Sequence, residues 1–355
     1  MFRPQCILVT GGAGFIGSNF IRWVLHRTDV HVVNFDALTY AGNIENLSDV
    51  DSAYGSGSAA RYRFVRGDVR DLDALTEGLR VTGYPAPDCV VHMAAESHVD
   101  RSIMGPAAFV ETNVGGTLTL LEACRAELNY RPRPFRFVQV GTDEVYGSLA
   151  EHDPAFTEQT PIRPNSPYSA SKAGADLLVR SYVHTFGFPA IVTRCSNNYG
   201  PYQFPEKLIP LMITRALADQ PLPVYGDGLN VRDWLHVEDH AAALWSVLTA
   251  GAVGEVYNIG GRAEHSNIEV VKTVLSLLHK PHSLIQYVQD RAGHDRRYAM
   301  NTDRICRELG WNPVHRFERG LADTVNWYVQ NRVWWERVLS EAYKATNALY
   351  LRASG

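Results

Sequence analysis

The stretch CILVTGGAGFIGSNF (6–20) decides the fold of this chain. Its first five residues are an apolar run that predicts a buried strand, and the apolar spacing over 15–27 predicts a helix. Gly11, Gly14 and Gly17 form a G-x-G-x-x-G pattern, which is weak evidence alone but strong between a strand and a helix. Small residues here let a diphosphate approach backbone N–H groups at the positive end of the helix. The pattern predicts a dinucleotide-binding turn; the alternative is a glycine-rich turn that only reverses the chain.

Strand and helix patterns continue to alternate after this turn. Continuous apolar strands separated by helices are typical of a parallel sheet that helices cover on both faces. We therefore expect an α/β fold with a doubly wound, Rossmann-type domain, which binds ligands at the carboxyl ends of its strands. Further strands are expected at 31–36, 62–68, 89–95 and 136–142, a helix over about 107–128, and a surface loop at 51–60.

At about 150 residues per domain, the length of 355 residues indicates either two domains or one large α/β unit. Residues 1–195 are expected to form mainly the dinucleotide-binding domain. Residues 196–355 are expected to form mainly a smaller α/β lobe for a substrate, with segments around 225–265 returning to the first domain. Helices are expected in this part at 205–219, 238–250, 266–279 and 317–342, the last with Leu321, Val325, Tyr328 and Val329 at helical spacing.

The composition excludes several classes of protein. Hydrophobic residues make up 45% of the chain and charged residues 20%, which argues against a disordered, collagenous or coiled-coil chain. The net charge of −4 argues against a nucleic-acid or anionic-membrane partner. No secretion signal and no apolar window of roughly 20 residues is visible in the sequence, so a cytoplasmic protein without a membrane partner is predicted.

The cysteines are widely spaced and odd in number, and no two form a C-x-x-C pair. This spacing indicates neither a zinc site nor a disulfide framework, so no metal is predicted. Buried, reduced thiols are expected. The five residues are Cys6, Cys89, Cys124, Cys195 and Cys306.

Acidic and small residues follow the predicted strands where a dinucleotide would lie. Asp36 ends the second strand; a carboxylate there accepts hydrogen bonds from the adenosine ribose and repels a 2′-phosphate, which favours NAD over NADP. Asp68 and Val69 follow the third strand and could hold the adenine. Ala94 and Ala95 follow the fourth strand and leave room for the cofactor backbone.

A second pattern carries acid–base chemistry. Tyr168 and Lys172 are four residues apart, which on a helix brings the ammonium beside the phenol. A nearby cation stabilises phenolate, so Lys172 is expected to lower the pKa of Tyr168 and make it a usable base near neutral pH. Thr142, at the end of the fifth strand, can supply the third polar group of this site.

Two consecutive carboxyls, Asp143 and Glu144, follow Thr142. Neighbouring residues on a strand point to opposite faces, so both can reach one substrate only if they lie in the turn beyond the strand. Two carboxyls a few ångströms apart do not both ionise easily, so one is expected to keep its proton to higher pH. The alternative is a solvated acidic pair on a surface loop.

These residues belong to longer motifs that resemble the dTDP-glucose 4,6-dehydratases of the extended short-chain dehydrogenase/reductase family. The resemblance covers nearly the whole chain. TDEVYG together with SNNYGPYQFPEKLIP is its most specific part, because the related epimerases and GDP-mannose 4,6-dehydratases differ there. The motifs are TGGAGFIGSNF (10–20), DALTYAGN (36–43), AAESHVDRS (94–102), ETNVGGT (111–117), GTDEVYG (141–147), SPYSASKAGAD (166–176), RCSNNYGPYQFPEKLIP (194–210), YGDGLNVRDWLHVEDH (225–240) and DRAGHDRRYA (290–299).

The resemblance implies a lyase that converts dTDP-glucose to dTDP-4-keto-6-deoxyglucose and water, with NAD as a bound catalytic group, for deoxysugar biosynthesis. Tyr168, assisted by Lys172 and Thr142, would take the C4 hydroxyl proton while hydride passes to NAD. Glu144 would remove the C5 proton. Asp143, kept protonated, would protonate the leaving C6 hydroxyl, and the hydride would return to C6.

Further sites follow from the resemblance by matching motif. The cofactor-side residues are Gly11, Gly14, Phe15, Ile16, Gly17, Asp36, Thr39, Asp68, Val69, Ala94, Ala95, Thr112, Tyr168, Lys172 and Asn198. The substrate-side residues are Ser97, Thr142, Asn197, Lys207, Leu208, Pro223, Tyr225, Arg232, Asn267, Asp290, Arg291 and His294.

Arg232 is the expected diphosphate clamp, because a guanidinium offers paired donors to phosphate oxygens. The alternative is an ion pair with Asp233 or Glu238.

Three departures from the family pattern are visible. Ala292 stands where a proline is usual, His236 stands where a tyrosine is frequent, and a substrate-contacting tyrosine of the family has no clear counterpart near the C-terminus, where Tyr350 is the nearest candidate.

Homodimers are common in this family, so a homodimer is expected. Apolar residues of the helix that carries Y-x-x-x-K could form its surface, although an apolar stripe is more often ordinary core. These residues are Leu177, Leu178, Tyr182, Val183 and Phe186.

Three alternative functions are weighed against the dehydratase. A nucleotide-sugar 4-epimerase on the same scaffold has no use for the carboxyl pair of Asp143 and Glu144. A non-catalytic NAD-sensing protein has no chemical need for Tyr168, Lys172 or that pair. A 4,6-dehydratase acting on a UDP- or GDP-sugar is the third alternative.

Overall fold

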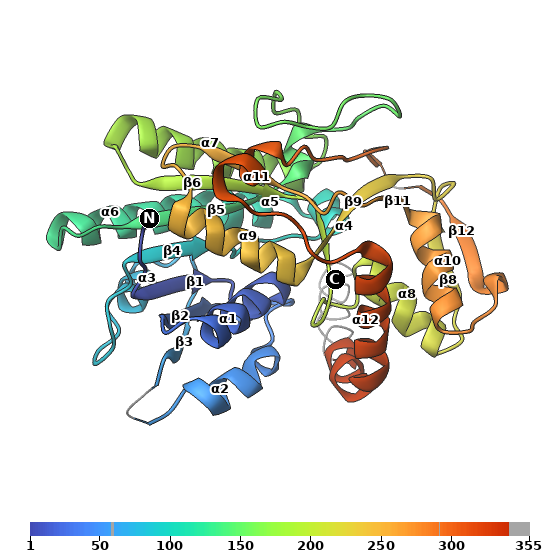
Figure 1. Ribbon diagram of the computed structural model, residues 1–355, viewed down its shortest axis with the longest axis horizontal. Helices are drawn as coiled ribbons and strands as arrows, with labels where there is room; N and C mark the ends of the chain where they lie inside the picture. Colours follow the sequence, from blue (N-terminus) through green and yellow to red (C-terminus); the bar gives the residue numbers. More distant parts are fainter. Residues whose placement is uncertain (58–59, 291, 341–355) are drawn as a thin grey trace, which may run out of the picture.

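Parallel strands form the central sheet, in the order β10-β6-β5-β4-β1-β2-β3 (Figure 1). The structure is a computed structural model that describes residues 1–57, 60–290 and 292–340. The strand order reverses at β1, because β2 and β3 lie on one side of it and the other strands on the other. This arrangement confirms the predicted doubly wound fold. The strands are β1 (Cys6–Thr10), β2 (His31–Asp36), β3 (Tyr62–Arg66), β4 (Cys89–His92), β5 (Arg136–Thr142), β6 (Ala190–Cys195) and β10 (Val256–Ile259).

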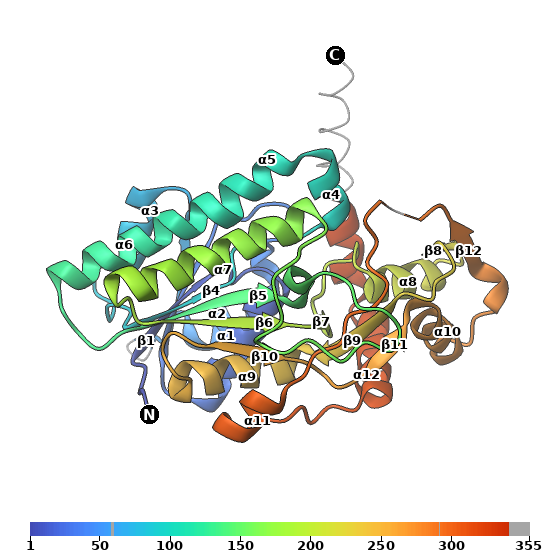
Figure 2. The same ribbon diagram turned by 90° about the horizontal axis from the view of Figure 1, so that it is seen from above.

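Helices cover both faces of this sheet, as Figure 2 shows. β1 gives the reason, because all five of its residues are buried: Ile7 and Val9 pack into one apolar core, and Cys6 and Leu8 into the other. Helices α3, α6 and α7 lie over one face, and α1, α2, α9 and α11 over the other. Their bounds are α1 (Phe15–Arg27), α2 (Ser48–Tyr54), α3 (Leu72–Leu79), α6 (Thr117–Tyr130), α7 (Pro167–Phe186), α9 (Val237–Ala250) and α11 (Asp303–Leu309).

The helical segment before β5 is longer than predicted and is not uniform. It runs as α5 (Pro106–Phe109), a π-helical stretch η2 (Val110–Gly116) and α6. A π-helical turn widens the backbone and often marks a functional site. Within it, Asn113 accepts a hydrogen bond from the backbone N–H of Glu96 at 2.8 Å and donates to its carbonyl at 3.0 Å. A short helix α4 (Val99–Met104) precedes this segment.

The predicted surface loop at 51–60 is wrong in its first part, because 51–54 belong to α2. Val50 is fully buried in the apolar core of the α1 face, and this packing orders a helix that the polar composition does not predict. Strands β3 and β4 are also shorter than predicted, since they end at Arg66 and His92.

The second lobe lies at one end of the sheet (Figure 1). Its core is formed by α8, α10 and α12 packed against two small sheets, with the orders β11-β9-β7 and β12-β8. The predicted loop after residue 196 therefore contains a short strand, β7. The elements are β7 (Asn197–Tyr199), α8 (Leu208–Leu217), β8 (Leu222–Tyr225), β9 (Val231–His236), β11 (Glu264–Ser266), α10 (Asn267–Leu277), η4 (His282–Leu284), β12 (Ile285–Val288) and α12 (Phe317–Gln330).

The predicted helix over 317–342 is broken. α12 ends at Gln330, Asn331 is a turn residue, and 332–340 are helical again. Leu321, Val325 and Tyr328 are buried as expected, but Val329 is 47% exposed because it faces away from the core. The break changes the direction of the chain after α12.

Two further expectations are tested by the fold. Cys6, Cys89, Cys124 and Cys195 are free and buried as predicted, whereas Cys306 is free but only partly buried. Among the residues that the structure describes, no helix is both long and apolar enough to cross a bilayer.

Candidate active site

The turn between β1 and α1 is shaped by close backbone contacts. Gly11 has φ +70°, and its N–H donates to the carbonyl of Phe35 at 2.9 Å. A Cβ on Gly17 would lie 2.3 Å from the carbonyl oxygen of Gly11, so no larger residue fits there. A Cβ on Gly14 would lie 3.3 Å from that same oxygen and otherwise meets open space within the described chain. Gly14 has no side chain to cap α1, so the first N–H groups of this helix face an open space that suits a phosphate.

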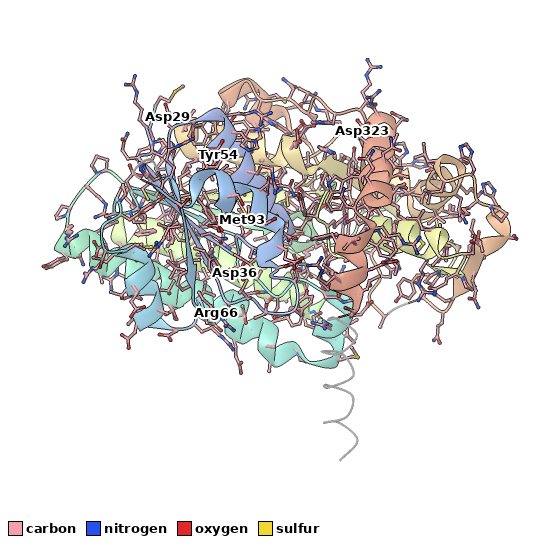
Figure 3. All side chains as sticks on the ribbon, turned by 90° about the horizontal axis from the view of Figure 1, so that it is seen from below. Asp29, Asp36, Tyr54, Arg66, Met93 and Asp323 are labelled. Carbon is pink, nitrogen blue, oxygen red and sulfur yellow. The ribbon has the colours of Figure 1, made fainter. Side chains whose placement is uncertain are left out.

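An open cleft of about 460 Å³ lies along the carboxyl ends of the central strands. Asp36, at the end of β2, and Met93, just after β4, belong to its walls and are labelled near the centre of Figure 3. The strand order reverses between β1 and β4, and this switch point is where doubly wound folds bind ligands.

All of the predicted cofactor-side residues line this cleft. Most come from segments at the ends of different strands; others come from the first turns of α1 and α7 and from the π-helical stretch η2, which contributes Thr112. The residues are Gly11, Gly14, Phe15, Ile16, Gly17, Asp36, Thr39, Asp68, Val69, Ala94, Ala95, Thr112, Tyr168, Lys172 and Asn198.

The two acidic residues of this group have different surroundings. Asp36 accepts hydrogen bonds from the N–H groups of Ala13 at 2.9 Å and Leu38 at 2.7 Å, and burial raises its pKa. Asp68 pairs with the guanidinium of Arg70 at 2.7 Å, which lowers the pKa of that carboxyl. Asp36 is therefore tied to the glycine-rich turn itself. The open turn and the buried carboxylate beside it fit a dinucleotide such as NAD.

Asp143 and Glu144 lie in a short 3₁₀ helix, η3 (Asp143–Tyr146), that follows β5 directly. The Thr142 hydroxyl accepts a hydrogen bond from the Glu144 N–H at 3.3 Å and donates to Asp143 Oδ1 at 3.2 Å. The turn brings both carboxyls to the cleft, as the sequence argument required, instead of directing them to opposite faces of a strand. A solvated surface pair is excluded, because Asp143 is only 2% exposed.

The pKa of Asp143 is raised well above its ordinary value. Burial is the largest cause, and the negative charges of Glu144 and Asp233 add to it, while Arg232 and the hydrogen bond with Thr142 act in the opposite direction. Asp143 Oδ2 has no hydrogen-bond partner among the described residues. Burial therefore favours the protonated, neutral form of Asp143, and one of its oxygens is available to a bound group.

Tyr168 and Lys172 reach the cleft from the first turns of α7. Ser166 begins this helix with a capping box, in which its hydroxyl accepts from the N–H of Ser169 at 3.1 Å. Tyr168 is held near Thr142 by a hydrogen bond. The Lys172 ammonium donates to the carbonyl of Val140 at 2.8 Å.

The expected lowering of the pKa of Tyr168 is wrong for this structure. Burial of the phenol raises its pKa well above the ordinary value, and the charge of Glu144 raises it further. Lys172 does not offset this rise; its own pKa is lowered by burial, and its ammonium is directed to the backbone of Val140. Sequence spacing alone does not include the desolvation of the phenol or the carboxylate of Glu144.

On the substrate side, the structure brings only part of the predicted set to the cleft. Ser97, Thr142, Asn197 and Lys207 line it, and the ammonium of Lys207 donates to the carbonyl of Ser97 at 2.8 Å. Arg291 lies outside the described residues. The other predicted residues lie elsewhere in the second lobe; they are Leu208, Pro223, Tyr225, Arg232, Asn267, Asp290 and His294.

Arg232 does not line the cleft and is 5% exposed. Its guanidinium donates to the carbonyls of Val231 at 2.8 Å and Asp295 at 3.0 Å, and it stacks on the ring of Tyr298 at 4.4 Å. Asp233, the alternative ion-pair partner, accepts from the backbone N–H groups of Gly261 and Ala263 at 3.1 and 2.8 Å. The diphosphate clamp stays a prediction.

Tyr225, Asp290 and His294 form a separate group on the rim of the second lobe. The His294 ring lies 2.6 Å from Asp290 Oδ1, and the Tyr225 ring packs edge-on against it at 6.2 Å. The Tyr225 hydroxyl donates to Asp100 of α4 at 3.4 Å. This group therefore links the second lobe to the first one across the rim.

The cleft also contains residues that the sequence argument did not select. Glu206 is mostly shielded from solvent, burial raises its pKa, and His98 lies 3.7 Å from it. The Tyr40 hydroxyl lies 3.5 Å from the Ser97 hydroxyl. All of these lie inside motifs already quoted, next to selected residues such as Lys207, so adjacency within a motif is the signal that could have found them.

Known proteins match this chain over almost its full length. The family model for GDP-mannose 4,6 dehydratase matches residues 8–324. A dTDP-glucose 4,6-dehydratase from Neisseria meningitidis serogroup B is 54% identical over 353 residues, which cover 95% of this chain and 97% of the relative.

Solved structures with the same fold as this chain differ in how similar their sequences are to it. DesIV, a dTDP-glucose 4,6-dehydratase from Streptomyces venezuelae solved with NAD bound, has a TM-score of 0.87 at 48% identity and covers 94% of this chain and 99% of its own. A UDP-glucose 4-epimerase from Thermus thermophilus in complex with NAD has a TM-score of 0.81 at 30% identity, with coverages of 92% and 99%. The epimerase shares the scaffold, whereas relatives at about half identity are dTDP-glucose 4,6-dehydratases. The chain therefore belongs to the dTDP-glucose 4,6-dehydratase family.

Proposed function

We propose that this protein converts dTDP-glucose to dTDP-4-keto-6-deoxyglucose and water, as an NAD-dependent hydro-lyase of deoxysugar biosynthesis. The observation that carries the proposal is the carboxyl pair in η3, where Asp143 is held neutral beside Glu144 in a cleft that also contains Tyr168 and Lys172. An epimerase needs no such acid and base in addition to the tyrosine and lysine. The identity of the relatives supports the same substrate.

Tyr168 acts as the base for the C4 hydroxyl, and Thr142 positions its phenol through their hydrogen bond. The glycine-rich turn and the carboxyl of Asp36 would hold NAD, which would supply the hydride acceptor for C4 and the hydride donor for C6. Lys172 orients the site from the carbonyl of Val140.

The carboxyl pair then performs the elimination. Glu144, next to the neutral Asp143, removes the C5 proton, which the C4 ketone has acidified. Asp143 holds a proton at neutral pH and gives it to the C6 hydroxyl, which leaves as water. The division of roles within the pair is thus set by burial: the more buried carboxyl is the acid.

The second lobe, with residues from 196 onward, holds the nucleotide sugar. Support comes from Lys207, which lines the cleft beside Ser97 and carries the positive charge that a diphosphate requires. The division at residue 195 is not strict, because α9 packs against α1 and β10 extends the central sheet. Arg232 as a diphosphate clamp belongs to this proposal.

A homodimer through α6 and α7 is the proposed assembly. Exposed apolar side chains on these helices support it: Leu118, Leu177 and Phe186 are 42%, 52% and 50% exposed. Tyr182, also predicted there, is buried and belongs to the core. Light scattering of the purified protein tests the dimer.

A cytoplasmic location is proposed from the free thiols of all five cysteines.

The decisive experiment mixes purified protein with dTDP-glucose without added cofactor and follows the alkaline absorbance of the 4-keto-6-deoxy product. Parallel reactions contain UDP-glucose, and each is repeated with NAD. Product from dTDP-glucose supports the proposal, and product without added NAD means that the cofactor co-purifies. UDP-galactose formed from UDP-glucose, with no dehydration even with NAD, would replace the dehydratase by the epimerase.

A further inference from the structure

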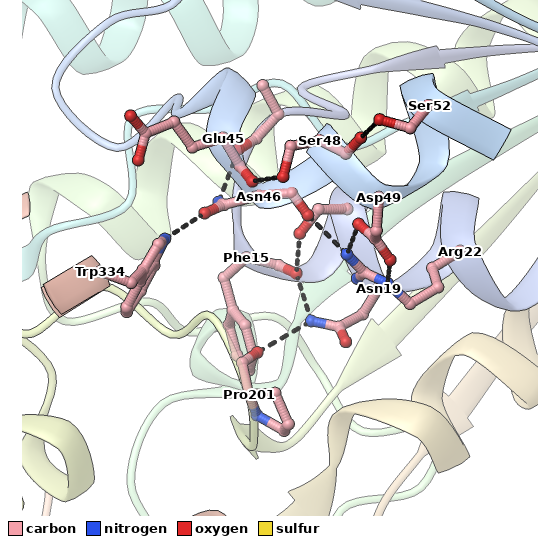
Figure 4. Close-up of polar contacts among 12 residues, drawn as sticks. Phe15, Asn19, Arg22, Glu45, Asn46, Ser48, Asp49, Ser52, Pro201 and Trp334 are labelled. Atoms are coloured by element: carbon pink, nitrogen blue, oxygen red, sulfur yellow. Dashed lines mark hydrogen bonds and ion pairs between the residues drawn. The ribbon is translucent and has the colours of Figure 1, made fainter. Parts of the chain in front are cut away.

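The residues that follow α12 reach from the second lobe to the glycine-rich turn of the first. Trp334 donates its indole N–H to Asn46 Oδ1 at 3.0 Å (Figure 4). The amide of Asn46 in turn donates to the carbonyl of Ala13 at 3.0 Å. Ala13 lies between Gly11 and Gly14, so two hydrogen bonds connect Trp334 to the phosphate-binding turn.

The Asn46 side chain is the relay in this connection, because it is 2% exposed and both of its polar atoms are used. Its backbone is also held, since Arg22 donates to its carbonyl at 2.6 Å and pairs with Asp49 at 2.8 Å (Figure 4). A second contact from the same C-terminal segment joins Arg337 to Glu45 at 2.6 Å. Glu45 and Asn46 lie in a short 3₁₀ helix, η1 (Ile44–Leu47), which therefore depends for part of its order on the C-terminal segment, residues 332–340.

Trp334 also belongs to an aromatic cluster with Tyr202 and Trp327, and this cluster packs beside a cleft residue of the second lobe. Tyr202 has φ +67°, an unusual value for a bulky residue, and its ring lies 4.7 Å from Trp327 and 5.7 Å from Trp334. The guanidinium of Arg22, in α1, lies over the Tyr202 ring, 4.6 Å from its centre. The next residue, Gln203, lines the cleft. Trp334 thus contacts two regions. It packs against Tyr202, which precedes the cleft residue Gln203, and it donates a hydrogen bond to Asn46, which contacts the phosphate-binding turn.

We propose that Trp334, acting through Asn46, is a positioning residue that keeps the phosphate-binding turn closed on NAD during the reaction. The inference rests on the proposed function, because a cofactor that is reduced and reoxidised within one turnover must not leave between the two steps. A turn whose carbonyl at Ala13 is held from the second lobe opens less often. The second lobe, which holds the sugar, thereby controls how long NAD stays bound.

Trp334→Phe tests this, because it keeps an aromatic ring in the cluster while it removes the indole N–H together with part of the bicyclic ring; the matched control loses the same atoms. The matched control is Trp335→Phe: the adjacent indole donates at 2.9 Å to the carbonyl of Tyr328, within its own lobe. NAD dissociation is measured by trapping released NAD from the purified holoenzyme, and thermal melting is measured alongside. Loss of one hydrogen bond predicts an about fivefold faster dissociation for Trp334→Phe and less than a twofold change for Trp335→Phe.

A double-mutant cycle isolates the relay. Asn46→Ala removes both hydrogen bonds, so adding Trp334→Phe to it should accelerate NAD dissociation no further. Additive effects of the two substitutions would overturn the relay.

Turnover gives a readout that a general loss of stability would not produce. Trp334→Phe should lose activity during turnover without free NAD, as the reduced cofactor escapes, and should recover it when NAD is added. If the wild-type protein neither binds NAD nor forms product, the proposed function fails. If it does both, and Trp334→Phe dissociates NAD no faster than Trp335→Phe, this inference alone fails.

Discussion

The cofactor wall of the cleft, lined by the predicted cofactor-side residues, is built mostly at or just after the ends of parallel strands. The sugar wall, lined by Ser97, Thr142, Asn197 and Lys207, combines residues that follow these strands with residues of the second lobe. Gly11, Asp36 and Thr142 each stand at or just after a strand end of one continuous sheet. Ser97 and Lys207 are 110 positions apart in the chain and meet through one hydrogen bond between the lobes. All predicted cofactor-side residues line the cleft, but most predicted sugar-side residues do not.

The comparison shows when a sequence motif is sufficient to predict where a residue lies in the fold. Strand ends in a parallel sheet lie at one edge, so residues that follow strands converge without further information. Tyr225, at the end of β8, and Arg232, in β9, belong to small strands of the second lobe, and they are placed by packing against partners from elsewhere in the chain. Substitutions can test the two walls separately. The largest effects are expected at Asp143 and Glu144, where the walls meet.

Glu144 lies in the cleft where the cofactor wall and the sugar wall meet. Its substitution should have the largest effect on the rate of product formation. Glu144→Gln removes the base for the C5 proton and should slow product formation by about 10³-fold. C4 oxidation should survive, so the absorbance of reduced cofactor should appear on mixing with dTDP-glucose. Normal dehydration by this variant would overturn the assignment of the base.

Asp143→Asn should slow dehydration by about 10²-fold, because the amide has no proton to give to the C6 hydroxyl. It should also change stability with pH. The raised pKa of Asp143 means that the folded protein keeps a proton that the unfolded chain releases above about pH 4, so wild-type stability falls as pH rises from there. Asp143→Asn should therefore gain stability over wild type between pH 5 and pH 8, measured by urea unfolding at each pH.

The control for this pH effect is Asp227→Asn. Arg296 pairs with Asp227 at 2.9 Å and lowers the pKa of that exposed carboxyl, so this substitution should act in the opposite direction and only slightly. A parallel pH dependence in the two variants would remove Asp143 as the proton-holding acid.

Gly14→Ala addresses the cofactor wall alone. Its Cβ would meet the carbonyl of Gly11 at 3.3 Å, a contact that a small shift relieves, but it would also occupy space open to the diphosphate. Affinity for NAD should fall about tenfold with little change in melting temperature, as measured by NAD titration of the apoprotein. Gly17→Ala is the comparison variant; its Cβ contact of 2.3 Å with that carbonyl should destabilise the fold itself.

Lys207→Met addresses the sugar wall and should have the smallest effect. It removes a positive charge and the hydrogen bond to Ser97, so the KM for dTDP-glucose should rise about fivefold while NAD affinity stays unchanged. Lys280→Met, which breaks a pair with Asp219 on the outside of the lobe, should leave KM unchanged. A fall in NAD affinity for Lys207→Met would mean that the two walls are not separable.

Particular residues show where sequence reasoning succeeded. The spacing of the glycine-rich turn and the apolar runs places Gly11 and Asp36 correctly, because both follow strands whose burial the local pattern already expresses. The position of Asp143 and Glu144 in a turn followed from the alternation of side chains on a strand. Those arguments use only neighbours in the sequence.

Other residues show where it failed. The pKa of Tyr168 was predicted in the wrong direction because it depends on burial and on Glu144, which approaches from another element. The helix break at Asn331 and the contact of Trp334 with Asn46, 288 positions apart, have no local signal. Cys306 is partly exposed because α11, unlike the central strands, is covered on one side only.

Local sequence patterns were enough to predict the doubly wound fold, the phosphate-binding turn and the acid–base residue types, and the longer motifs were enough to identify the family. Short-range periodicity and chain direction suffice for these, because strand ends and helix faces are set within about 10–20 residues. Only the tertiary structure decided which carboxyl keeps its proton, which sugar-side residues reach the cleft, and how the C-terminal segment contacts the glycine-rich turn. Burial and charge at a point are sums over elements distant in the chain, and packing alone brings those elements together.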